Sequence, residues 1–266
     1  MMLFVRVLCL LLLMNTWAEA REQLKLNWST YHFTGDYGRV TGIETETLVN
    51  QLSVNYQRPQ WQLGFSQAYL SQTGPRTLLI DEYVDEDGFL IREFIERNEE
   101  RRGLGDPNIK FSYQWPKQTS YYRQSGGLWR ASGRWKIPLA DDENGFSNGR
   151  HEWFAAIQRS QRFDQLSLSM TLGRHWRTHK QDAANNARNY IRLSTMFFPE
   201  RRIGIGASFY AKQASTGSVD DVRSGSLNGY WRINRDWSLS GSVGKGFSDV
   251  VSDQVFGLNL SHRWRL

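Results

Sequence analysis

The sequence predicts an all-β protein, a closed antiparallel transmembrane β-barrel of about 12 strands (10–14). Three observations predict this fold. Apolar and polar residues alternate along many short segments, the links between these segments alternate between short and long, and aromatic residues gather near the short links. The chain has 266 residues, which is enough for one large β domain, and no break in composition divides it into two.

Alternation with a period of two is clearest over residues 225–233. Leu227 and Trp231 fall on one face of an extended chain there, and Asn228 and Tyr230 fall on the other. A membrane barrel turns one face of each strand to lipid and the other to its lumen, so this pattern suits its strands. The same pattern predicts strands over residues 23–33, 47–56, 60–71, 106–115, 127–137, 151–160, 165–177, 188–198, 202–212, 225–233, 237–246 and 258–266.

The links between these strands alternate in length. Outer-membrane barrels have short turns on the periplasmic side and long loops outside, and an even strand number brings both termini to the periplasmic side. The link at 116–126 is the exception, because it is longer than its side predicts. The short links are 57–59, 161–164, 199–201 and 234–236, and the long ones are 34–46, 73–105, 139–150, 178–187 and 215–222.

Aromatic residues lie near the short-link ends of the strands, mostly on the apolar face. Outer-membrane barrels carry such a girdle at the membrane interface. A soluble β-sandwich or a lectin-like barrel, with the same aromatic residues in its core, is the alternative fold. A sandwich has no need to collect aromatic residues at one end of so many strands. The girdle residues are Tyr56, Trp61, Trp115, Trp129, Phe163, Phe197, Trp231, Trp237 and Trp264.

Residues 1–20 have the pattern of a secretory signal peptide, with a basic residue at 6, an apolar run over 7–14 and small residues at 18 and 20. The run is too short to cross a bilayer as a helix, which needs about 20 apolar residues. Cys9 lies early in this run rather than after it, which argues against a lipid anchor. We expect cleavage after residue 20 and a barrel over 21–266 in the cell outer membrane.

Cleavage there would remove Cys9, the only cysteine, so neither a disulfide nor a cysteine-ligated metal could stabilise the mature chain. The formal net charge of +6 is modest, and its placement matters more than its size. We expect no cofactor, no metal and no nucleic-acid partner. The expected partners are the lipid bilayer, lipopolysaccharide, the outer-membrane assembly machinery and a small-molecule solute.

Short motifs in the second part of the chain resemble one family of outer-membrane barrels. GLGD at 103–106 opens a strand that continues as IKFSYQW, and KIPL at 136–139 ends another. The chain closes with SHRWRL, in which Leu266 stands where such barrels usually end in Phe. Together these stretches are similar to the family named for the meta-pathway of phenol degradation. The resemblance implies an outer-membrane channel or transporter, and it supplies no catalytic residues.

Basic residues on the polar faces are the candidate solute contacts. In strand 127–137, Arg130, Arg134 and Lys136 fall on the face opposite the tryptophans. A cation on the lipid side costs about 2–4 kcal/mol near the midplane, so this basic row is expected to face the lumen. Two interpretations stay open. The cations could form a track that favours anions, or they could pair with inward Glu152 and loop carboxylates and fill the barrel. The predicted pore-lining residues are Lys25, Lys110, Arg130, Arg134, Lys136, Arg192, Arg232 and Arg263.

The longest link, 73–105, contains a predicted β-hairpin. Two strand-like runs, 77–84 and 89–95, flank Asp-Glu-Asp-Gly, and Asp-Gly between such runs favours a tight turn. We expect the hairpin to extend two neighbouring barrel strands on the extracellular side. The turn matches a calcium loop only in part, because Tyr83 and Phe94 stand where two carboxylate ligands belong. The charged residues that follow favour a solvated surface, and a gate or a patch bridged by divalent ions to lipopolysaccharide is the alternative.

The sequence therefore predicts a channel or transporter for passive passage of small, anionic or aromatic solutes. One alternative is a closed structural or accessory barrel of an envelope or export complex, since side chains can fill a small barrel. Another is a lipid hydrolase, which needs a serine and a histidine on the outer wall. No recognisable serine motif accompanies the histidines, so we expect no enzyme activity. These histidines are His32, His151, His175, His179 and His262.

Overall fold

The computed structural model describes residues 22–35, 45–84, 90–115, 127–140, 146–147, 149–177, 187–213, 221–248 and 252–266, with the side chains of 75–99 excepted. No helix in this part of the chain is long and apolar enough to cross a membrane. The described residues form one antiparallel sheet. Its strands are β1 (Gln23–Gly35), β2 (Thr45–Gln57), β3 (Trp61–Val84), β4 (Leu90–Leu104), β5 (Asn108–Gln114), β6 (Leu128–Lys136), β7 (Glu152–Phe163), β8 (Leu166–Arg177), β9 (Arg188–Glu200), β10 (Ile203–Lys212), β11 (Val222–Arg232), β12 (Trp237–Gly246) and β13 (Gln254–Arg265).

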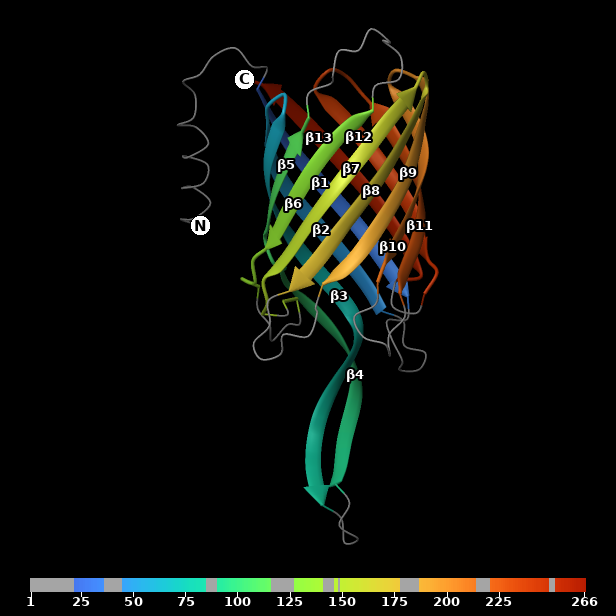
Figure 1. The fold of residues 1–266 in the computed structure, drawn as a ribbon. Helices are drawn as coiled ribbons and strands as arrows, with labels where there is room; N and C mark the ends of the chain where they lie inside the picture. The colour runs from blue at the N-terminus through green and yellow to red at the C-terminus, as the bar shows by residue number, and fades with distance from the viewer. Residues whose placement is uncertain are drawn as a thin grey trace.

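The sheet closes on itself as a barrel (Figure 1). β1 pairs with β2 on one side and with β13, the last strand, on the other, and β2 pairs in turn with β3. Both β4 and β5 pair with β3, along different parts of its length, so these two strands share one position in the wall. The thirteen strands therefore make twelve wall positions, which confirms the predicted fold class. Closure gives the wall strands a backbone partner on each side, as a lipid environment demands.

A short break between β4 and β5 divides the shared wall position. Gly105 N donates to Ala68 O at 2.9 Å, and Gln67 Nε2 donates to Gly105 O at 2.6 Å, so the break stays attached to β3. Pro107 has no N–H for a strand ladder, which is a physical reason for the interruption here. The break places the side chain of Asp106 at the end of the barrel that carries the long links, where it contacts the segment after β6.

Apolar side chains cover the outside of the barrel, and the interior is polar. Leu172 is 50 % exposed and Ile205 is 61 % exposed, whereas few apolar residues of the described part of the chain are buried, Tyr56 and Ala156 among them. A soluble β-sandwich would bury such side chains between two sheets. The inverted distribution is that of a barrel whose outer wall faces lipid, and it excludes the sandwich.

Most of the predicted girdle residues lie exposed on the outer wall near the short turns. Tyr56 is an exception, because it is only 6 % exposed. Its ring lies 5.4 Å from that of Trp61, and its hydroxyl donates to Glu22 Oε2 at 2.5 Å. Tyr56 therefore packs within the turn region instead of facing lipid. The exposed members are Trp115, Trp129, Phe163, Phe197, Trp231, Trp237 and Trp264.

The two ends of the barrel differ. The short turns lie at the end where the described chain begins and finishes, and there Leu266 N donates to Glu22 O at 3.0 Å. The outer parts of β3 and β4 form a long hairpin that projects from the opposite end (Figure 1). Placement of the hairpin outside the cell stays a prediction. The predicted signal peptide at 1–20 and the turn at 85–88 lie outside the described residues.

Candidate functional site

The candidate site is the barrel lumen, where basic side chains from separate strands meet. Lys110 on β5, Arg130 and Arg134 on β6, and Arg192 on β9 line one cavity of about 510 Å³. We call these four residues the central cations. Serine, glutamine and threonine side chains complete much of the cavity wall, so the interior is hydrophilic.

The other four predicted pore-lining residues do not line this cavity. Lys25 is in register with Arg263 on β13 and with Asn55 on β2, and Asn55 lines the same cavity as the central cations. Arg232, at the end of β11, lines a second cavity. Lys136, at the end of β6, is in register with Glu152 on β7. Whether any of the eight contacts a passing solute stays a prediction.

Neutral groups contact the three arginines among the central cations. The guanidinium carbon of Arg134 lies 3.6 Å from the ring centroid of Phe154, and that of Arg192 lies 5.3 Å from the ring centroid of Tyr210. Arg130 Nη2 donates to Gln114 Oε1 at 3.0 Å. A cation over an aromatic face is attracted by the ring quadrupole without losing its charge.

None of the central cations forms an ion pair with a described carboxylate. Within the described residues, no carboxylate lies within 4.0 Å of a nitrogen of a central cation. Lys110 and Arg192 are also exposed, and the space they face is the lumen. Their positive charge is therefore presented to the cavity, which is the arrangement that lowers the barrier for an anion.

Glu152 contacts a separate group of basic side chains at the long-link end of the barrel. Its Oε1 lies 3.2 Å from Lys136 Nζ and 3.0 Å from Arg177 Nε, and its Oε2 lies 2.9 Å from His175 Nε2. Glu152 is 6 % exposed and His175 is 1 % exposed. A carboxylate as buried as Glu152 needs partners, so this cluster is structural. Among the described residues, the pairing interpretation thus fits Lys136 and not the central cations.

Asp106 extends the same network into the segment after β6. One carboxylate oxygen accepts hydrogen bonds from the backbone N–H groups of Leu139 at 3.1 Å and Ala140 at 3.0 Å. The other accepts from Ser147 Oγ at 2.9 Å and lies 3.1 Å from Lys136 Nζ. A single buried carboxylate therefore attaches this segment to the barrel wall.

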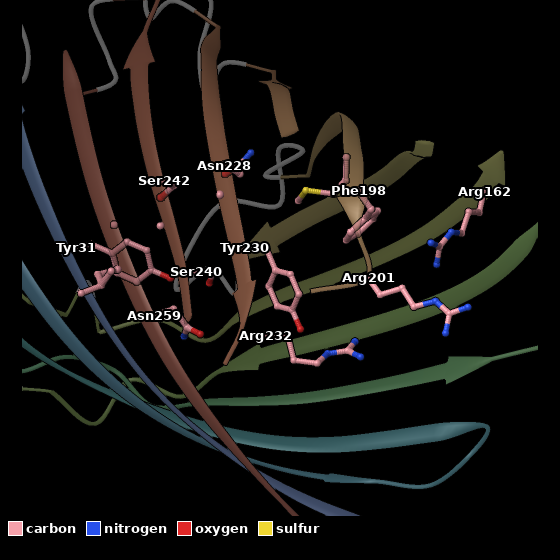
Figure 2. Close-up of a pocket in the computed structure, with 15 residues that line it drawn as sticks. Tyr31, Arg162, Phe198, Arg201, Asn228, Tyr230, Arg232, Ser240, Ser242 and Asn259 are labelled. Atoms are coloured by element: carbon pink, nitrogen blue, oxygen red, sulfur yellow. The ribbon is translucent and has the colours of Figure 1, made fainter. Parts of the chain in front are cut away.

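Some lumen arginines were not among the predicted residues, and two of them line the second cavity. Arg162 and Arg201 line the same cavity as Arg232, a space of about 790 Å³ near the short turns (Figure 2). Arg162 lies in β7, which runs beyond the strand end predicted at residue 160, and its alternation with Gln158 and Ser160 would have placed it inward. Arg201 lies in a turn, where alternation gives no signal.

The histidines occupy different surroundings. His32 lies on the outer wall 2.6 Å from Glu46 Oε1, and the ring of His262 packs between those of Trp237 and Trp264. Trp135 Nε1 donates to His151 Nδ1 at 3.1 Å, and His179 lies outside the described residues. Within the described part of the chain, no group of three or more histidine, cysteine, aspartate or glutamate residues is placed to hold a metal ion.

Comparison with known proteins gives the same architecture. No family model matches the sequence, and no curated protein matches it. An outer membrane channel from Pseudomonas putida F1 aligns with a TM-score of 0.64 at 10 % identity, covering 93 % of this chain and 97 % of that one. The KdgM porin aligns with a TM-score of 0.54 at 7 % identity, covering 90 % and 98 %. By fold, then, the chain is an outer-membrane β-barrel. The resemblance to the phenol-degradation family stays a prediction.

Proposed function

We propose that the protein is an outer-membrane channel for passive passage of small anionic solutes. One observation carries this proposal, namely the central cations around an interior cavity without a carboxylate partner among the described residues. Such charges favour anions in a water-filled lumen and oppose cations. The likeness in fold to a solved outer membrane channel supports the role, and a KdgM porin of similar fold was solved in complex with disordered oligogalacturonate.

Anionic solutes are better supported than neutral aromatic ones. Aromatic rings do line the central cavity, including those of Phe154, Tyr190 and Tyr210. Two of these rings already have a guanidinium over one face, that of Arg134 or of Arg192, so this face is not free to stack on a solute. The cations of these pairs still point hydrogen-bond donors at the cavity, and a carboxylate accepts such donors well.

The test is single-channel recording of the purified protein in a planar bilayer. We expect conductance with a reversal potential, in a potassium chloride gradient, that shows anion preference. Preference for cations would refute the proposal. Absence of conductance at every salt concentration would favour the alternative, a closed structural or accessory barrel of an envelope or export complex.

The surroundings of the barrel form part of the proposal. Lipid acyl chains contact the exposed apolar outer wall, lipopolysaccharide surrounds the hairpin end, and the outer-membrane assembly machinery inserts the barrel after export. We propose no catalytic role. Release of fatty acid from phospholipid vesicles by the purified protein would overturn that part.

A further inference from the structure

A second group of cations meets at the short-turn end of the lumen. Arg162 from β7, Arg201 from the turn after β9, and Arg232 from the end of β11 line one cavity of about 790 Å³. Figure 2 shows their guanidinium groups on one side of this cavity. The barrel wall brings together three strand ends that lie far apart in the sequence, and the central cations line a different cavity.

These three arginines are held without an acidic partner. Arg162 Nε donates to the backbone carbonyl of Asp164 at 2.9 Å, and its guanidinium lies 5.3 Å from the ring centroid of Phe198. Within the described residues, no carboxylate oxygen lies within 4.0 Å of a guanidinium nitrogen of the three. All three residues are exposed to solvent. Like charges gathered in this way repel one another, and an anion that binds among them removes that repulsion.

The opposite side of the cavity carries neutral hydrogen-bonding groups. Figure 2 places Ser240, Asn228 and Asn259 there, with the hydroxyl of Tyr230 between them and the arginines. Asn259 Nδ2 donates to Ser29 Oγ at 2.5 Å, which leaves the Asn259 carbonyl oxygen as an acceptor. One wall of the cavity therefore suits a negative charge, and the facing wall suits hydroxyl groups.

We infer that this cavity binds acidic saccharides, whose carboxylates face Arg162, Arg201 and Arg232 while their hydroxyls face the neutral wall. A carboxylate takes the planar fork of a guanidinium in bidentate geometry. Hydroxyls both donate and accept, as the serine, tyrosine and asparagine groups require. A volume of about 790 Å³ falls within the range of small-molecule sites and has room for more than one sugar ring. The inference rests on the proposed function in that solute must reach the lumen.

The test is isothermal titration calorimetry on the purified barrel in detergent micelles at low salt. The probes are sodium digalacturonate, which has carboxylates and hydroxyls; biphenyl-4,4′-dicarboxylate, which has the charges without the hydroxyls; and maltose, which has the hydroxyls without the charges. We expect digalacturonate to bind more tightly than either of the other two. Arg162→Gln and Arg201→Gln should each raise its dissociation constant by about fivefold. Arg202→Gln is the matched control, because Arg202 neighbours Arg201 but does not line the cavity, and it should leave binding unchanged.

A second pair of changes tests the neutral wall. Tyr230→Phe combined with Ser240→Ala should weaken digalacturonate by about threefold and leave biphenyl-4,4′-dicarboxylate unchanged, because it removes hydroxyls only. Equal binding of the two dianions would overturn the saccharide assignment, and no binding of digalacturonate, or binding insensitive to both arginines, would overturn the site. Calorimetry detects binding whether or not the barrel conducts ions. The reversal potential in chloride tests the proposed function separately, so either idea can fail alone.

Discussion

Anion preference should fall when central cations are neutralised, and Arg134→Gln with Arg192→Gln is the perturbation that tests it. Treated as a sphere, the cavity of about 510 Å³ puts an ion at its centre about 5 Å from the wall. Two unit charges about 5 Å apart in water interact with a Coulomb energy of about 0.8 kcal/mol. Screening over a Debye length of about 10 Å at 0.1 M salt reduces this to about 0.5 kcal/mol.

The same charge attracts an anion and repels a cation by this energy. Each lost charge therefore changes the difference between the anion barrier and the cation barrier by about 1 kcal/mol. That corresponds to about a fivefold change in the anion-to-cation permeability ratio for each arginine, and about 25-fold for both. In 1 M salt, where the Debye length is about 3 Å, the change for each arginine shrinks to less than about twofold. The variants keep a polar, uncharged side chain at each position, which limits any change in the cavity wall.

The assay is the reversal potential of single channels in potassium chloride gradients centred on 0.1 M and on 1 M. Arg159→Gln is the matched control, because Arg159 lies on the outer wall over the ring of Trp129. We expect the control to keep the original reversal potential. An unchanged value in the double variant, or an equal shift in the control, would show that the central cations do not set selectivity.

Three further predictions concern the wall that surrounds the lumen. Glu152→Gln should destabilise the barrel by about 3–5 kcal/mol, measured as the urea midpoint in micelles, because it removes the buried carboxylate that the partly exposed Lys136 and Arg177 share; Glu46→Gln, at a side chain that is 63 % exposed, should cost less than about 1 kcal/mol. Asp106→Asn should speed limited proteolysis within 137–147, because Asp106 attaches that segment; equal cleavage rates in the variant and the parent would contradict this role. Ile157→Arg should cost about 2–4 kcal/mol because Ile157 faces lipid and is 52 % exposed, whereas Gln158→Arg, which adds a cation to the lumen, should be tolerated. The opposite order of stability, read from heat-dependent migration on gels, would show that the two faces are reversed.

Much of the barrel follows from local sequence pattern. A strand turns alternate side chains to opposite faces, so the outward tryptophans and the inward cations of β6 could be assigned without knowledge of any neighbour. The twelve wall positions follow in the same way, from the count of alternating segments. The pattern did not predict that β4 and β5 share one wall position. This sharing depends on how the two strands pair with β3 and not on the pattern of either segment.

The sequence by itself therefore determined the face on which each strand residue lies, and with it the predicted set of inward cations. Only the tertiary structure decided which of those cations have partners. Lys136 meets Glu152 and Asp106, while Arg134 lies over Phe154. The tertiary structure also places Arg162 and Arg201 at the cavity that Arg232 lines. The physical reason is that alternation fixes the direction of a side chain, whereas closure of the barrel fixes which strands and turns lie side by side.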